Sequence, residues 1–193
     1  DQFQPVRFGE RLWVVPSWLS PPEPDSIHLL LDPGLAFGTG DHPTTALCLT
    51  WLSNHDLSGK TVVDFGCGSG ILACAAAKLG AERVIGTDID PQAMHASAQN
   101  AAQNQAQLDL YLPDQMPDVK ADIVVANILF NPLKMLAPQL LSLLASDGLL
   151  VMSGVLIEQV DPLIEHYQAL GTKLVSFTEQ GDWAQVVLVK AKG

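Results

Sequence analysis

The sequence is poor in cysteine, and its few cysteines are not spaced for metal or disulfide chemistry. Cys48, Cys67 and Cys74 are an odd number and form no CxxC pair, which argues against a zinc site and a disulfide framework. Cys67 and Cys74 lie among glycine and alanine residues, where small side chains favour packing. We therefore expect free, buried thiols in a cytoplasmic protein. The histidines show no metal-ligand spacing, so we expect no metal site.

Positive charge and long apolar runs are also scarce. Ten Lys and Arg residues stand against 21 Asp and Glu residues, a formal net charge of -11. Such a field repels a phosphate backbone and attracts a basic protein, so we expect no direct nucleic-acid binding. No apolar run approaches the roughly 18 residues of a membrane-spanning helix, and the first residues hold no apolar signal segment. We expect no membrane contact.

What the chain does have is apolar sequence in short runs. Its 193 residues are 48% hydrophobic, enough for one domain with a core on both sides of a sheet. Two strand-like runs, "RLWVVP" and "IHLLLD", flank a proline-rich surface connection and lead into the fold. The chain begins with Asp1 rather than Met, so we expect a fragment or a processed product.

From Thr61 onward, short apolar runs alternate with helical patterns. The strands are expected at residues 61–65, 83–87, 109–112, 123–126, 149–153, 173–177 and 184–189, and the helices at residues 70–79, 91–105, 132–144 and 158–170. Near-continuous Val and Ile strands alternating with helices predict an α/β fold with a parallel sheet covered on both faces. The last two strands are joined by the short link "TEQGDW", which predicts an antiparallel hairpin at one sheet edge.

The junction "VVDFGCGSG" places three glycines on alternate positions between a strand and a helix. A purely structural turn usually needs one glycine. Gly66, Gly68 and Gly70 together remove the β-carbons that would keep a ligand from the backbone, and they permit positive φ values. The helix that follows directs free N–H groups at the same place. These glycines favour a small-molecule site at the carboxyl edge of the sheet.

The carboxylates around this junction indicate which ligand. Gly70 comes one residue too early for the dinucleotide pattern G-x-G-x-x-G. Asp88, at the end of the next strand in "GTDID", can accept both hydroxyls of a ribose. Asp64 would repel a pyrophosphate but suits a ligand with an amino group and a sulfonium; the alternative is that it only caps the turn. Together these residues favour S-adenosyl-L-methionine over a nicotinamide nucleotide.

The two stretches resemble the nucleotide-binding motifs of class I S-adenosylmethionine-dependent methyltransferases. The resemblance implies a Rossmann-like fold: a seven-stranded, mostly parallel sheet with helices on both faces and an antiparallel last strand. It implies a cofactor but no particular substrate.

Two further stretches narrow the function. In "LDPGLAFGTGDHPTT", glycines make a pliable loop that can act as a flap, with Phe37 as apolar shielding and a threonine as polar contact; the alternative is an ordinary loop before a capped helix. In "ADIVVANILFNPL", Asn127 directly follows a buried strand, where its amide oxygen can accept a hydrogen bond from an attacking nitrogen. The alternative is a helix cap, for which Asn131 is better placed.

The motifs "DPGLAFGTGDHPTT", "DFGCGSGILA", "GTDIDPQA" and "VVANIL" occur in this order. The combination resembles the bacterial ribosomal protein L11 methyltransferases over essentially the whole chain. By motif, the cofactor contacts of that family fall on Thr45, Gly66, Asp88 and Asn127, with Phe37 and Gly68 adjacent. The residue after "NIL" is commonly small in that family but is Phe130 here, so the shape of the substrate channel is expected to differ from the family's.

The resemblance implies lead-in strands and the start of the flap over residues 1–40, and the S-adenosylmethionine-binding methyltransferase domain over residues 41–193. It implies an additional amino-terminal domain for substrate recognition, which we expect to be absent from this sequence. The expected activity is N-methylation of lysine and terminal amino groups of a basic ribosomal protein, L11 of the large-subunit stalk base, with Asn127 as the catalytic residue. A small-molecule methyltransferase and a cofactor-binding fragment without activity remain the alternatives.

Overall fold

The computed structural model describes residues 4–23, 25–31 and 43–191, which form two sheets flanked by helices. The larger sheet has seven strands in the order β6-β5-β4-β7-β8-β10-β9. Its strands are β4 (Thr61–Phe65), β5 (Arg83–Thr87), β6 (Asp109–Tyr111), β7 (Ala121–Asn127), β8 (Leu144–Leu156), β9 (Thr172–Gln180) and β10 (Trp183–Lys190). β10 lies between β8 and β9 and runs antiparallel to both, whereas the other neighbouring strands described in this sheet pair in parallel. The predicted α/β sheet with an antiparallel last strand is confirmed.

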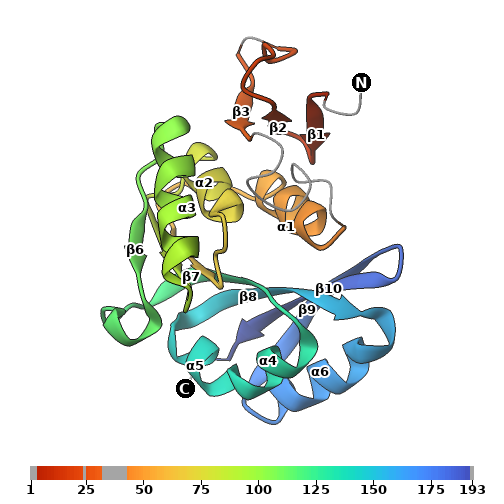
Figure 1. The fold of residues 1–193 in the computed structure, drawn as a ribbon. Coiled ribbons are helices and arrows are strands. Elements are labelled where there is room, and N and C mark those ends of the chain that lie inside the picture. Colours follow the sequence, from red (N-terminus) through yellow and green to blue (C-terminus); the bar gives the residue numbers. More distant parts are fainter. Residues whose placement is uncertain (1–3, 24, 32–42, 192–193) are drawn as a thin grey trace.

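The helices form a layer on each face of this sheet (Figure 1). One layer contains α1 (Pro43–Ser53), α2 (Ile71–Lys78) and α3 (Pro91–Gln103). The other contains α4 (Phe130–Met135), α5 (Ala137–Ser142) and α6 (Val160–Gln168). Two short 3-10 helices, η2 (Pro113–Gln115) and η3 (Ile157–Gln159), precede β7 and α6.

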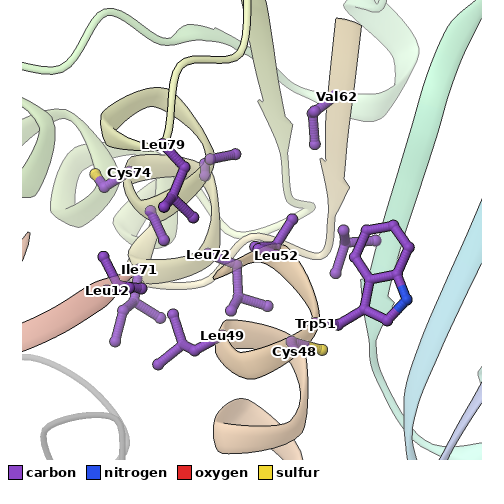
Figure 2. Packing of buried hydrophobic residues seen from close by; sticks show 14 of the residues in the cluster. Leu12, Cys48, Leu49, Trp51, Leu52, Val62, Ile71, Leu72, Cys74 and Leu79 are labelled. Carbon is purple, nitrogen blue, oxygen red and sulfur yellow. The ribbon is translucent and has the colours of Figure 1, made fainter. Parts of the chain in front are cut away.

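Each face of the sheet has its own apolar core, because successive strand residues point to opposite sides. Val62 packs with α1 and α2, whereas Val63 packs with α4, α5 and α6. Figure 2 shows the first core, where Leu49 and Leu72 from the two helices meet Leu12 from the amino-terminal sheet. Burial on both faces explains why the central strands are almost continuously apolar.

The helix predicted at residues 132–144 is two shorter helices. Pro138 lies in the first turn of α5, and its ring nitrogen has no proton to donate to the preceding turn. The helical path therefore restarts at Leu136, which ends α4 and precedes α5. β8 then begins at Leu144, five residues before the predicted start at residue 149. It includes Asp147 at a φ of +64°, so this part of the strand is irregular.

The smaller sheet contains β1 (Val6–Phe8), β2 (Leu12–Val15) and β3 (Ile27–Leu30). β1 is antiparallel to β2, and β3 is parallel to it. Arg11 of the β1–β2 turn donates hydrogen bonds to the carbonyl oxygens of Ser53 and His55 at the end of α1, over 2.8 and 2.6 Å. The side chain of Asn104, after α3, both accepts from and donates to the backbone of Leu30. These contacts fix the small sheet to the helices that carry the candidate site.

Candidate functional site

The glycine junction folds back on the end of the neighbouring strand. The N–H groups of Gly66 and Cys67 both donate to the carbonyl oxygen of Thr87, over 2.8 and 2.9 Å. Gly66, Gly68 and Gly70 have φ values of +79°, +54° and +83°, a region that residues with a β-carbon rarely adopt. All three positions therefore have the positive φ values that the sequence analysis expected of these glycines.

Asp88 binds this junction through its carboxylate. Oδ2 accepts the N–H of Gly68 over 2.9 Å, and Oδ1 accepts the N–H of Asp90 over 3.0 Å. Asp90 in turn caps α3 by accepting the N–H of Gln92, with Pro91 at the first helical position. The structure thus brings Gly66, Gly68 and Asp88 together at the carboxyl ends of β4 and β5.

Asp64 lies beneath the glycines and is only 2% exposed. Its Oδ2 accepts the N–H of Ala73, in the first turn of α2, over 3.1 Å, which is the capping contact left open by the sequence. The pKa of this carboxyl is raised to about 7, mainly by burial; the hydrogen bond from Ala73 opposes the increase, and the charge of Asp88 adds to it. The carboxyl of Asp64 therefore loses its proton as the pH rises through neutrality.

Two residues that the sequence analysis did not single out hold the junction from α3. Ser97 Oγ donates to the carbonyl oxygen of Gly68, and Asn100 Nδ2 donates to that of Ser69, both over 2.8 Å. Both side chains are buried on the helix face that contacts the loop. Their spacing of three residues, which places them on one face of a helix, is the signal that could have identified them.

Asn127 and Thr45 meet on the other side of the same sheet edge. Asn127 is the last residue of β7, and its Nδ2 donates to Thr45 Oγ1 over 3.3 Å. Thr45 lies in the first turn of α1 and is 1% exposed. This contact uses the donor side of the amide, so Oδ1 is the atom left to accept a hydrogen bond from a substrate.

A pocket of about 390 Å³ opens beside Asp88 at this edge. Its walls come from the ends of β4, β5 and β7 and from the segment that leads into α4 and α5: Phe65, Gly66, Thr87, Asp88, Ile89, Pro113, Ile128, Leu129, Pro132 and Leu136. Ile89 and Leu129 are 84% and 63% exposed, which is unusual for such large apolar side chains next to a carboxylate. A flat, apolar group joined to a hydroxylated group suits this pocket.

The predicted flap residue Phe37 lies outside the described residues. Among the described residues, no group of three or more His, Cys, Asp or Glu side chains could hold a metal ion. The helices of the described part of the chain are all too short or too polar to cross a membrane. The candidate site therefore consists of the glycine junction, Asp88, the pocket and the Asn127–Thr45 pair.

The sequence profile of a known family, described as ribosomal protein L11 methyltransferase, matches residues 1–191. The chain belongs to this family. A family member from Pseudomonas paraeruginosa is 60% identical over 172 residues, which are 88% of this chain and 58% of that protein. One from Vibrio campbellii is 56% identical over 189 residues, 96% of this chain and 64% of that protein. The chain thus spans about three fifths of the length of these L11 methyltransferases.

Solved structures agree with this assignment. The crystal structure of a ribosomal protein L11 methylase from Lactobacillus delbrueckii subsp. bulgaricus superposes with a TM-score of 0.84 at 32% identity, covering 100% of both chains. A magnesium protoporphyrin IX methyltransferase from Synechocystis, solved with bound S-adenosylmethionine, has a TM-score of 0.59 at 20% identity over 74% of this chain and 76% of its own. The second likeness shows the fold only.

Proposed function

We propose that this L11 methyltransferase family member binds S-adenosyl-L-methionine and transfers its methyl group to lysine and terminal amino groups of ribosomal protein L11. The proposal rests on two features that lie at the ends of two adjacent strands, β4 and β7. β4 ends in the glycine junction joined to Asp88, and β7 ends at Asn127, with Phe65 paired to Ala126. A cofactor site and a polar side chain able to bind an amine therefore share one edge.

The residues of the site fit this cofactor. A β-carbon built on Gly68 would meet no described atom within 4 Å, so the glycine leaves room that the described part of the chain does not fill. Asp88 offers a carboxylate for the ribose hydroxyls, and the apolar pocket beside it suits adenine. We assign Gly66, Gly68, Asp88, Thr45 and Asn127 to the cofactor site; the role of Phe37, which lies outside the described residues, stays a prediction from the sequence. Asp64 supports the junction by accepting the N–H of Ala73 in the first turn of α2, and its contact with the amino group of the cofactor stays a prediction from the sequence.

The chemistry requires an unprotonated amine held in line with the methyl group. When bound, S-adenosylmethionine supplies an electrophilic methyl group on a positively charged sulfur. A lysine amine has a reference pKa of about 10.4, and both desolvation and the nearby positive charge lower it. Asn127 Oδ1 then accepts a hydrogen bond from the amine and directs its lone pair at the methyl carbon. Positioning of this kind supplies most of the rate enhancement that we expect.

The net charge of the chain supports L11 as the partner, in addition to the family to which the chain belongs. The chain has a formal net charge of -11, and such a surface attracts a basic protein. The cysteines are free and buried, which fits a reducing cytoplasm, where ribosomal proteins are found.

Methyl transfer from labelled S-adenosylmethionine to purified L11 tests the proposal. We expect incorporation with the wild-type chain and a loss of about 100-fold or more with Asn127→Ala, while cofactor affinity changes much less. A longer family member measured alongside shows how much of the activity this chain carries by itself. Transfer to a metabolite but not to L11 would instead identify a small-molecule methyltransferase. Cofactor binding without transfer to either would identify a fragment that needs further sequence for activity.

A further inference from the structure

The segment after Asn127 lies close to two glycines, Gly154 of β8 and Gly66 of the junction that follows β4. β7 ends at Asn127, whose last partner in the sheet is Ser153 of β8. β8 continues to Leu156, so the chain leaving β7 must cross it at the next residue, Gly154. A β-carbon on Gly154 would lie 2.3 Å from the carbonyl oxygen of Ile128 and 2.9 Å from its carbonyl carbon. Only glycine allows this backbone crossing.

The side chain of Ile128 lies close to the second glycine, Gly66. A β-carbon on Gly66 would lie 2.9 Å from Ile128 Cγ2. Ile128 therefore has its carbonyl against Gly154 of β8 and its γ2-methyl group against Gly66 of the cofactor junction. The nitrogen of Ile128, which belongs to the peptide group with Asn127, is also close, 3.3 Å from the β-carbon position of Gly154.

We propose that Gly154 is a positioning residue for methyl transfer: it lets the backbone of Ile128 lie against β8, and so sets the place of the preceding residue, Asn127, and of its side-chain amide. This inference rests on the proposed function. It assigns a role in methyl transfer to a residue that lies outside the sequence motifs of the cofactor and substrate sites. Gly154 has a φ of +95°, so both its backbone conformation and its close contact require glycine.

The size of the effect follows from the geometry. Carbon and carbonyl oxygen atoms of non-bonded groups approach to about 3.3 Å, so an alanine at position 154 must displace Ile128 by roughly 1 Å. A displacement of about 1 Å at a reacting group costs on the order of 100-fold in rate. We expect Gly154→Ala to lower kcat by about this factor, and to weaken S-adenosylmethionine binding by a smaller factor, because Ile128 also lines the pocket.

Gly148→Ala is the matched control. Gly148 is buried in the same strand, and its β-carbon would lie 2.9 Å from the carbonyl oxygens of Ala121 and Ala145. It lies at the opposite end of β8, far along the strand from Ser153 and Asn127. Both variants should lower Tm, but only Gly154→Ala should lower kcat per cofactor-binding molecule. Equal kcat values in the two variants would overturn the proposal.

A second measurement does not depend on activity. The side-chain amide of Asn127, which donates to Thr45, has its own NMR signals, and we expect them to shift in Gly154→Ala and to stay in place in Gly148→Ala. If the wild-type chain transfers no methyl group, the proposed function is wrong. The NMR signals still show, in that case, whether Gly154 sets the position of the Asn127 side chain. Should Gly154→Ala not fold, Ile128→Leu, which removes the γ2-methyl group, must shift the Asn127 signals. Unmoved signals would refute the proposal.

Discussion

Asp64→Asn should abolish a dependence of stability on pH that arises from one buried carboxyl. Burial raises the pKa of Asp64 from its ordinary value of 3.8 to about 7 in the folded protein. Between these two values the folded protein keeps a proton that the unfolded chain has released, so the stability that this group contributes falls as pH rises. It is fully present below about pH 4 and is lost as pH rises through about 7.

The magnitude follows from this difference in pKa. A change of about 3 units corresponds to about 4 kcal/mol over the whole range, of which about 3 kcal/mol falls between pH 5 and pH 8. Asparagine keeps an oxygen for the N–H of Ala73 but cannot ionise. Its extra N–H donors are buried at a cost that is the same at every pH, so this cost cancels when the two pH values are compared.

Urea unfolding of wild type and Asp64→Asn at pH 5 and pH 8 measures the effect. The free energy of unfolding of the variant, relative to wild type, should be higher at pH 8 than at pH 5 by about 3 kcal/mol. Asp56→Asn is the control, because the hydrogen bond from the Ser58 backbone lowers the pKa of Asp56. Asp56 is thus ionised in both states throughout this range. A pH-independent difference for Asp64→Asn would refute the assignment.

Three further substitutions test the site and its support. Asp88→Asn keeps an acceptor for the Gly68 N–H but loses the charge, and should weaken S-adenosylmethionine binding at least tenfold by calorimetry; unchanged affinity would contradict the ribose assignment. Ser97→Ala removes the hydrogen bond to the Gly68 carbonyl and should weaken binding several-fold, whereas a purely structural role would alter Tm alone. Tyr167→Phe leaves the buried Leu133 carbonyl without its 2.6 Å donor and should cost about 1–3 kcal/mol in urea unfolding at normal cofactor affinity.

Local sequence signals located most of the fold. Short apolar runs predicted β4 and β5 at the observed bounds, and the helical pattern from residue 91 predicted the start of α3. The break at Leu136 was missed, although Pro138 was the local signal for it. β1 was missed because three residues, two of them exposed, carry no clear periodicity.

The site was predictable to the extent that its parts are local. The glycine junction and Asp88 follow directly from the ends of two strands, and both are in place. The contact of Asn127 with Thr45 joins residues 82 positions apart, and the Ile128–Gly154 crossing depends on how far β8 continues past β7. Such contacts are set by the packing of whole elements, and no short stretch of sequence specifies them.

The most direct test of the account is a calorimetric titration of this chain with S-adenosylmethionine and with its demethylated product. We predict one site per chain for both ligands, with affinity reduced in Asp88→Asn. A folded chain that binds neither ligand would contradict the central claim that the edge formed by β4, β5 and β7 is a cofactor site.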